Sequence, residues 1–332
     1  MLRVGLNPYG IAYSVGLFGA DSARPNLHPL GLDGFLDLAD SIGAAGVEIP
    51  VALLKNVRDA DVGRVCARLH ENGKYAVLMH GIPWGDLDGS LRVAERFGFP
   101  IVRLHLTAVL CGDRAALGAE WARIISGARA QLKGYAQKAA GMGIDITVED
   151  HQDLTSAELV DICGECGSNV GICLDTGNPL SVGEEPAQFA RAVAPLVRHV
   201  HLKDYRVHWS AEGYRLARCP IGEGAVPWEE IAKILEPLGP LPASIEPGAL
   251  TERHIRLLND DWWENYPERR ARDFAACVKF ARAACEPDES DWRTPWEHNA
   301  DSETVMKYEI DELANSVANL QEMGLMSVDG SL

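Results

Sequence analysis

Residues 144–150 read Ile-Asp-Ile-Thr-Val-Glu-Asp, and residues 171–176 read Gly-Ile-Cys-Leu-Asp-Thr. Each stretch is a short, mostly apolar run that ends in polar residues and precedes a segment with helical spacing. Short runs that are apolar on both faces are typical of the buried strands of a parallel sheet. The two stretches therefore predict strand–helix units.

The same pattern recurs along the chain. Reference points near the ends of successive runs are 25 to 45 residues apart (6, 48, 80, 105, 149, 175, 201 and 246), which leaves room for a strand, a loop and a helix each. We find eight such runs, at residues 3–7, 46–50, 75–81, 101–106, 144–150, 171–176, 198–204 and 243–247.

Eight parallel strands that alternate with helices predict a closed (β/α)8 TIM barrel of the α/β class. An open, doubly wound sheet is the alternative. It would usually carry a glycine-rich dinucleotide turn after its first strand, and residues 7–10, Asn-Pro-Tyr-Gly, do not form one. The pattern therefore favours the barrel.

Composition excludes two classes of function. The 332 residues contain 31 Lys and Arg against 48 Asp and Glu, a formal net charge of −17. Binding to nucleic acids or to anionic membranes needs a basic surface, so neither is expected. No apolar stretch of about 18 residues predicts a membrane span. Residues 1–6 show no signal-peptide pattern, and we expect a cytoplasmic protein.

The eight cysteines are scattered, which favours free thiols over a disulfide framework. Cys163 and Cys166 form a single C-x-x-C motif without a second half. Two thiols on a helix surface are the first interpretation of this motif, and a zinc knuckle is the alternative.

The segment 286–332 differs from the rest of the chain. Twelve of its residues are acidic and two are basic, which gives it −10 of the total charge. Trp292 and Trp296 are apolar anchors that argue against simple disorder. We expect a helix over 303–323 that either folds back on the barrel or contacts a second subunit. Its predicted apolar stripe consists of Met306, Ile310, Leu313, Val317 and Leu320.

Four consecutive predicted strands end in potential metal ligands, namely Glu149, Asp175, His201 and Glu246. The carboxyl ends of barrel strands meet at one face, so these side chains are expected to converge. A buried carboxylate costs several kcal/mol unless it is paired or bound to an ion. Three carboxylates and one imidazole predict one divalent ion, with Mn²⁺ the first choice and Mg²⁺, Co²⁺ or Zn²⁺ as alternatives.

This order of ligands, with Asp-Thr-Gly-Asn at 175–178 and His-Leu-Lys-Asp at 201–204, resembles the xylose isomerase-like barrel superfamily. The turn Pro-Ile-Gly-Glu-Gly at 220–224 resembles the Gly-x-Gly loop of that family. Relatives include sugar epimerases, inosose dehydratases, hydroxypyruvate isomerases and apurinic-site endonucleases. The resemblance covers residues 1–285, which we take as the barrel domain, and leaves 286–332 as an extension.

One departure from the family is informative. The endonucleases carry a three-metal cluster with a histidine three residues after the aspartate, and this chain has Asn178 there. His80 and His105 do stand where the family places histidines. Several cluster ligands are still absent, so the resemblance implies a single metal and, together with the acidic charge, argues against a DNA substrate.

A single metal between two glutamates predicts removal of a proton next to a sugar carbonyl. Glu149 and Glu246 are the expected base and acid. His151, two residues after Glu149, is a further candidate for proton transfer, since we expect its pKa near neutrality, or else a hydrogen-bonding group.

Other side chains are candidates for substrate binding. Lys203 would neutralise an oxyanion or orient Asp204. His80 and His105 are the other polar candidates for substrate binding. Two aromatic residues of predicted loops, Tyr9 and Trp84, are candidates for stacking on a sugar or an aglycone.

Three functions fit these residues. The first is isomerisation or epimerisation of a keto-sugar. The second is β-elimination, as in the catalytic subunits of C-glycoside deglycosidases, which cleave 3-oxo-glycosides together with a smaller subunit. The third is a non-catalytic barrel subunit. The first two imply a small sugar or glycoside as substrate and an oligomer, with or without a smaller second chain.

Overall fold

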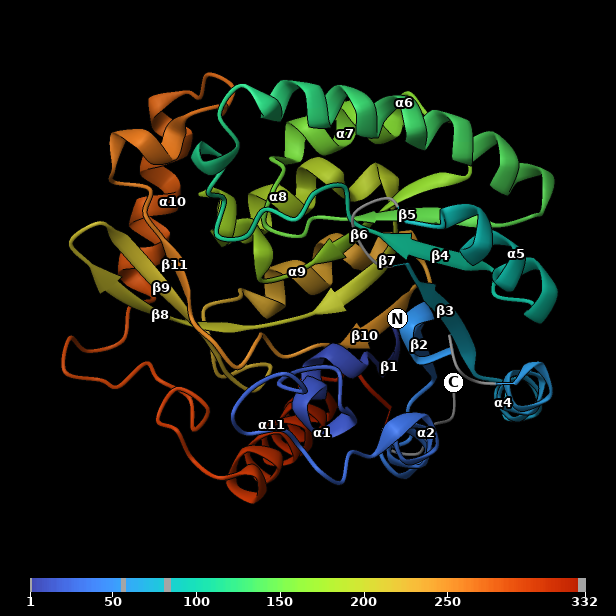
Figure 1. The fold of residues 1–332 in the computed structure, drawn as a ribbon. Helices are drawn as coiled ribbons and strands as arrows, with labels where there is room; N and C mark the ends of the chain where they lie inside the picture. The colour runs from blue at the N-terminus through green and yellow to red at the C-terminus, as the bar shows by residue number, and fades with distance from the viewer. Residues whose placement is uncertain (1, 55–57, 81–84, 328–332) are drawn as a thin grey trace.

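The computed structural model describes residues 2–54, 58–80 and 85–327. Eight parallel strands close into a barrel, in the order β1-β10-β7-β6-β5-β4-β3-β2 (Figure 1). The predicted (β/α)8 architecture is confirmed. The barrel strands are β1 (Arg3–Leu6), β2 (Gly46–Pro50), β3 (Tyr75–Met79), β4 (Ile101–Leu104), β5 (Asp145–Glu149), β6 (Val170–Asp175), β7 (Val197–Leu202) and β10 (Pro242–Ile245).

Helices surround the barrel (Figure 1). None in the described ranges is both long and apolar enough to cross a membrane. Side chains cap the starts of four of the described α-helices. Thr155, for example, accepts a hydrogen bond from the Glu158 amide, and the Glu158 side chain bonds back to Thr155. The α-helices are α1 (Ala12–Val15), α2 (Gly31–Ser41), α3 (Val51–Leu54), α4 (Asp59–Glu71), α5 (Leu87–Phe97), α6 (Glu120–Gly141), α7 (Ser156–Gly164), α8 (Pro186–Val193), α9 (Trp228–Leu235), α10 (Ala271–Ala283) and α11 (Ser302–Glu322).

Most predicted strands run one or two residues past the observed carboxyl ends. Strand β3, for instance, ends at Met79 and β4 at Leu104, whereas the predictions extend to 81 and 106. Strand pairing stops where the barrel mouth opens. His80, His105 and Lys203 therefore stand in the loops just beyond the ladder.

A second sheet was not predicted. Strands β8 (Tyr205–Ser210), β9 (Gly213–Arg218) and β11 (Arg253–Ile255) form an antiparallel sheet beside the barrel mouth. Their apolar residues pack around Trp262, which is fully buried. The sequence interpretation expected no strands here, neither in the loop between the last two barrel strands, which contains β8 and β9, nor after the last barrel strand, where β11 lies.

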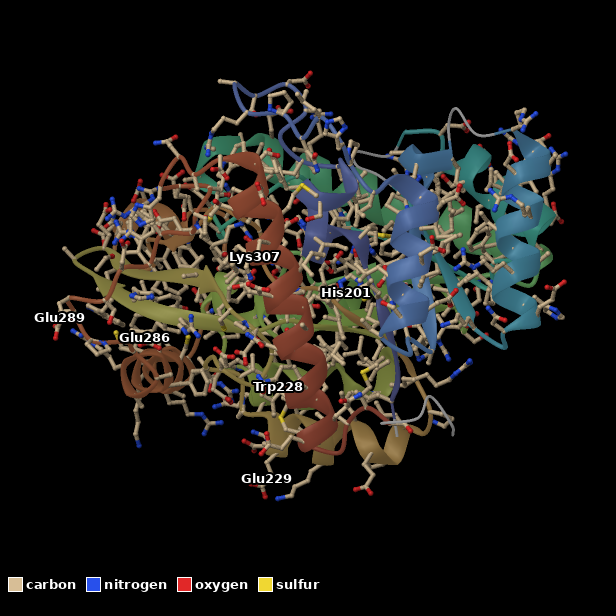
Figure 2. All side chains as sticks on the ribbon, turned by 90° about the horizontal axis from the view of Figure 1, so that it is seen from below. His201, Trp228, Glu229, Glu286, Glu289 and Lys307 are labelled. Carbon is tan, nitrogen blue, oxygen red and sulfur yellow. The ribbon has the colours of Figure 1, made fainter. Side chains whose placement is uncertain are left out.

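The C-terminal helix folds back on its own barrel, as the first interpretation of this segment expects. Figure 2 shows α11 crossing the molecule, with Lys307 in its N-terminal half and Trp228 near its C-terminal end. The predicted stripe packs inward, although Met306, Ile310 and Val317 are only half-buried. Two carboxylates share the buried face. The buried side chains of α11 are Val305, Glu309, Glu312, Leu313, Ser316 and Leu320.

Candidate active site

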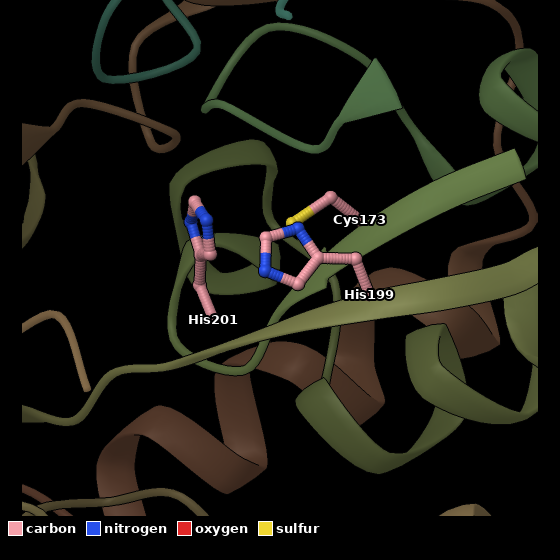
Figure 3. Close-up of side chains that lie close together, drawn as sticks. All are labelled: Cys173, His199 and His201. Atoms are coloured by element: carbon pink, nitrogen blue, oxygen red, sulfur yellow. The ribbon is translucent and has the colours of Figure 1, made fainter. Parts of the chain in front are cut away.

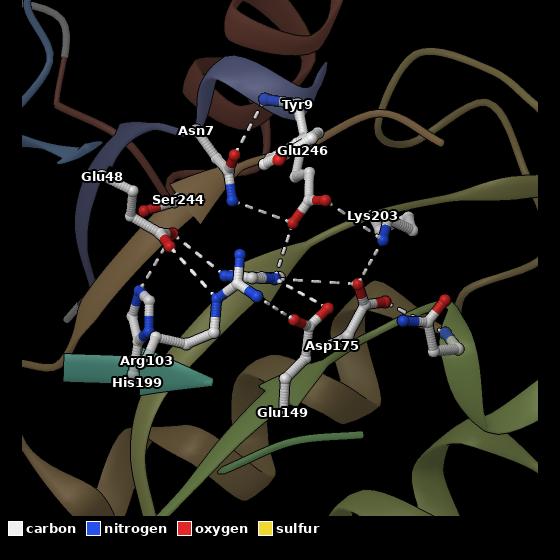
Figure 4. A network of polar contacts seen from close by, with 12 residues as sticks. Asn7, Tyr9, Glu48, Arg103, Glu149, Asp175, His199, Lys203, Ser244 and Glu246 are labelled. Atoms are coloured by element: carbon white, nitrogen blue, oxygen red, sulfur yellow. Dashed lines mark hydrogen bonds and ion pairs between the residues drawn. The ribbon is translucent and has the colours of Figure 1, made fainter. Parts of the chain in front are cut away.

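The four predicted ligands converge inside the mouth of the barrel. Glu149 ends β5, Asp175 ends β6, His201 lies in β7, and Glu246 follows β10. One ligand atom from each lies within 4.8 Å of the others, and all four residues are buried. His201 Nδ1 is 2.6 Å from Glu246 Oε2 and 3.4 Å from Glu149 Oε1 (Figure 4). The structure therefore brings this predicted set together.

Backbone and amide donors orient two of these carboxylates. Asp175 Oδ1 accepts hydrogen bonds from the amides of Gly177 and Asn178, both at 3.0 Å, which leaves Oδ2 turned toward His201 and Lys203. Asn7 Nδ2 donates to Glu246 Oε2 at 3.0 Å. The Asp-Thr-Gly-Asn motif thus positions the aspartate through its own turn.

Two permanent cations lie against the acidic set. Arg103 Nη1 is 2.8 Å from Glu149 Oε2, and Lys203 Nζ is 2.5 Å from Asp175 Oδ2. Burial by itself raises the pKa of Glu149, but Arg103 and His201 outweigh it and hold that pKa well below its usual value. The pKa of Glu246 is also lowered, because Lys203 and His201 outweigh the effect of burial. Both carboxylates are ionised at neutral pH.

The charge balance of the site fits one divalent cation. Its carboxylates are Glu149, Asp175 and Glu246, together with Glu48, which lies 3.0 Å from His201 Nε2. Lys203 and Arg103 neutralise two of these four charges. Against the effect of burial, Cys173 and Glu48 raise the pKa of His199 to about 9 and that of His201 well above its usual value, so these two imidazoles carry the balancing protons when no ion is bound. A divalent ion would supply the same two charges. Within the described ranges, Glu149 Oε1 and His201 Nδ1 are buried without a well-aligned hydrogen bond and have only the ion-pair contacts given above. A metal ion would satisfy both atoms.

A second group of potential ligands shares His201. Cys173 and His199 lie with it in neighbouring strands β6 and β7 (Figure 3). Cys173 and His199 are completely buried, and neither lines the cavity described below. Glu149 and Glu246 line that cavity, and Asp175 and His201 lie beside them within the same ligand set. We therefore assign the candidate metal position to Glu149, Asp175, His201 and Glu246.

The candidate metal position forms part of the wall of a cavity of about 980 Å³. A cavity of this volume accommodates a small sugar or a glycoside. The predicted site residues that line it are Tyr9, His80, His105, Glu149, His151, Lys203 and Glu246.

His151 differs from its prediction in one respect. Burial lowers its pKa to about 4, so the expectation of a pKa near neutrality is wrong. Its ring stacks on that of His105, with centroids 4.1 Å apart and planes 11° from parallel. Burial also holds the pKa of His105 well below its usual value. The cavity therefore presents two neutral imidazoles.

The remaining predicted residues are distributed as follows. His80 Nδ1 lies 2.8 Å from Ser90 Oγ. Lys203 contacts Asp175 and Glu246, not Asp204. Trp84 lies outside the described residues.

The C-x-x-C motif departs from its first interpretation, because the Cys163 side chain is in the core and not on a helix surface. Neither this cysteine nor Cys166 belongs to a metal-capable group within the described ranges. All eight cysteines are free thiols, as predicted.

Two central residues were missed in the sequence. Glu48 lies in β2 and contacts the Nε2 atoms of His199 and His201, at 3.2 and 3.0 Å. Arg103 lies in β4 between Glu48 and Glu149. Each is a charged residue inside an apolar strand, Val-Glu-Ile-Pro and Ile-Val-Arg-Leu. A charged side chain in a buried strand needs a partner that compensates its charge. This argument identified the four ligands, and it applies equally to Glu48 and Arg103.

Comparison with known proteins agrees with this architecture. A family model described as xylose isomerase-like TIM barrel matches residues 36–263. The chain belongs to this family. Over 98 residues it is 30% identical to the uncharacterized protein YihM of Escherichia coli K12, a match that spans 29% of this chain and 30% of YihM.

Two solved structures of low sequence identity share the fold. One is a D-psicose 3-epimerase crystallised in the presence of D-fructose, with a TM-score of 0.61 and 16% identity, covering 99% of this chain and 100% of that one. Another is the IolI protein with a bound zinc atom, with a TM-score of 0.53 and 13% identity, covering 85% of this chain and 96% of that one.

Proposed function

We propose that the protein is a divalent-metal-dependent enzyme that removes a proton next to the carbonyl of a keto-sugar and thereby isomerises or epimerises it. One observation carries the proposal. Glu149 and Glu246, both ionised, lie on either side of His201 in a four-residue ligand set that opens to a sugar-sized cavity. The similar fold of an epimerase crystallised with D-fructose supports a sugar as substrate.

Glu149, Asp175, His201 and Glu246 would hold the ion, with Mn²⁺ as our first choice. When bound, a divalent ion supplies Lewis acidity that polarises a carbonyl oxygen and stabilises the negative charge that develops there. The imidazole of His201 must then be neutral, and Glu48 fixes its orientation by contact with Nε2.

The protein's own groups move the proton. Glu246 and Glu149 stand at the ends of strands on different sides of His201, so one can accept a proton from a carbon while the other donates to the opposite face. Arg103 and Lys203 keep both carboxylates deprotonated at neutral pH. The side chains of His80 and Tyr9 line the same cavity and are proposed to bind sugar hydroxyls.

A β-eliminating lyase is the second candidate, and His151 favours it. Its Nδ1 atom is buried and lacks a hydrogen bond in the described part of the structure. A neutral imidazole with a free nitrogen is suited to proton transfer at a leaving group. A smaller partner subunit, as in the C-glycoside deglycosidases, would belong to this candidate.

The test replaces each glutamate by glutamine, which keeps its shape and one oxygen but removes its basicity. We expect Glu149→Gln and Glu246→Gln each to lower kcat by about 1,000-fold on a panel of ketoses. An exposed carboxylate far from the site, Glu229, provides the matched control Glu229→Gln. Wild-type turnover in both site variants would show that enolisation at this site is wrong.

His151→Ala distinguishes the two chemistries. In a lyase it stops release of the leaving group, while exchange of the C–H hydrogen with D₂O continues. In an isomerase it weakens substrate binding and leaves the product unchanged. A metal-stripped protein that keeps its fold but loses its turnover would exclude the third interpretation, a non-catalytic barrel subunit.

A further inference from the structure

Arg253 lies in β11 and lines the cavity of the candidate active site. Side chains alternate along a strand, so Arg253 shares a face with Ile255, which is fully buried in the core of the small sheet. His254, between them, bonds to Ser210 on the other face. The guanidinium therefore points inward, toward the cavity.

This arginine differs from the other basic groups of the cavity wall. Within the described ranges, the lysine and arginine side chains that line the cavity are Arg103, Lys203, Arg218 and Arg253. The first three form ion pairs with carboxylates at 2.5–2.8 Å. No carboxylate of the described chain comes within 4.0 Å of Arg253.

Most of the donors of this guanidinium are unused. In the described structure all its side-chain hydrogen bonds come from Nη1, to Thr251 Oγ1 at 3.0 Å and to the carbonyl oxygens of Thr251 and Glu252 at 3.4 Å. Its Nε is buried and has no partner among the described residues.

Glu252, next to Arg253 in the sequence, and Asp113 are engaged elsewhere. Glu252 pairs with Arg215 at 2.8 Å, and the carboxylate of Asp113 pairs with Arg256 at the same distance. A planar guanidinium with free N–H groups on a cavity wall matches the oxygens of a carboxylate or a phosphate. Sugar hydroxyls can accept its hydrogen bonds but cannot neutralise its charge.

We propose that Arg253 binds an anionic oxygen group, a carboxylate or a phosphate, on the sugar that occupies this cavity. The substrate would then be an acidic or phosphorylated keto-sugar and not a neutral one. The inference rests on the proposed function for the identity of the sugar part. It assigns to the small sheet, which the sequence interpretation missed, the role of selecting the charged end of the substrate.

Isothermal titration calorimetry of the full chain with Mn²⁺ tests the proposal, using D-fructose, D-fructuronate and D-fructose 6-phosphate as probes. We expect one of the two anionic ketoses to bind at least about tenfold more tightly than D-fructose. Which of the two shows the gain distinguishes a carboxylate from a phosphate. Arg253→Gln should abolish the gain and leave the D-fructose affinity within about twofold, and Arg253→Lys should retain part of it.

Arg256→Gln is the matched control, because Arg256 pairs with Asp113 and does not line the cavity. It should leave all three affinities unchanged. The proposal is overturned if neither anionic ketose binds more tightly than D-fructose, or if Arg253→Gln weakens all three probes equally. Tight, Arg253-dependent binding without C–H exchange in D₂O would support the anion site and contradict the proposed enolisation.

Discussion

Asp150 and Asp175 are neighbouring buried aspartates with different roles. The Asp175 amide donates to Asp150 Oδ1 at 2.6 Å, and burial together with the charge of Asp175 raises the pKa of Asp150 well above its usual value. Asp150 therefore keeps its proton to a higher pH than an ordinary aspartate, and its Oδ1 atom serves as an acceptor for the Asp175 backbone. Asp175 turns one oxygen toward the proposed ion and pairs with Lys203.

This difference predicts unequal effects of the same substitution. Asp175→Asn removes a charged ligand, and we expect the affinity for Mn²⁺, measured by isothermal titration calorimetry, to fall by about 100-fold or more. Asp150 is not one of the four ligands, and Asp150→Asn keeps an acceptor oxygen for the Asp175 amide, so it should change that affinity by less than about threefold. Equal losses in the two variants would contradict the assignment of Asp175 as a ligand.

Asp153 gives the protein a pH-dependent stability that is separate from the ligand set. Burial raises its pKa from the ordinary 3.8 to about 7, although Thr107 Oγ1 donates to it at 2.8 Å. Between those pH values the folded chain keeps a proton that the unfolded chain releases. Stability therefore falls as the pH rises through this window and stays reduced above it.

Asp153→Asn removes that effect. Relative to wild type, the variant should gain roughly 2–4 kcal/mol of unfolding free energy between pH 4.5 and pH 8. Urea unfolding in EDTA at the two pH values measures the gain. Asp161→Asn, at an exposed aspartate paired with Arg129, is the control and should show no such gain. A pH profile of Asp153→Asn that parallels wild type would show that Asp153 is ionised in the folded state.

At the scale of elements, α11 holds the segment that follows β1. Glu309 is fully buried and accepts hydrogen bonds from the amides of Tyr13 and Ser14, at 3.1 and 2.7 Å, and from Ser14 Oγ at 2.7 Å. Arg218, which pairs with the neighbouring turn of α11, also donates to the carbonyl of Gly10 at 2.9 Å. Residues 10–14 directly follow Asn7, which bonds to Glu246, and Tyr9, which lines the cavity. By holding these residues, α11 supports part of the cavity wall.

Glu309→Gln tests this support. The amide offers one acceptor oxygen where the carboxylate offers two, so a buried backbone N–H loses its partner, and we expect a loss of about 1–3 kcal/mol of unfolding free energy. The KM for the sugar should rise, because Tyr9 lines the cavity, while the affinity for Mn²⁺ stays unchanged. Glu303→Gln, at an exposed position of the first turn, is the control. An unchanged KM would show that the helix stabilises the fold without shaping the site.

The elements also show what the sequence could predict. Strands β2 and β6 were recognisable because buried parallel strands are apolar on both faces, and the ligands because charges at their ends need compensation. Glu48 and Arg103 can be found by the same argument about compensated charges, provided that it is applied to the interior of a strand as well as to its end. The polar face of α11 could not be found, because Glu309 is stabilised by donors almost 300 residues away in the sequence. Nor could β11, a strand of three residues, be distinguished from a loop.

Across the whole molecule, acidic charge lies in two places with different consequences. The segment 286–332 carries −10 of the net −17, and many of its carboxylates are exposed to solvent, where they attract cations weakly and without selectivity. The barrel interior holds fewer carboxylates, but they are buried and exceed the permanent cations beside them by two charges. The interior set surrounds an imidazole nitrogen with three carboxylates, a combination that favours a transition metal over calcium.

Metal binding should therefore stabilise the fold selectively. At an Mn²⁺ concentration about 100 times the Kd, binding adds roughly 2.7 kcal/mol, so Tm should lie about 4 °C above its value in EDTA. Differential scanning calorimetry measures the shift. Asp175→Asn should abolish it, because the interior set then loses a charged ligand while the acidic surface is unchanged. Ca²⁺ is the control for that surface, since it prefers oxygen ligands and gains little from His201. If Ca²⁺ raised Tm as much as Mn²⁺ did in wild type and in Asp175→Asn alike, the stabilisation would come from the acidic surface and not from the barrel site.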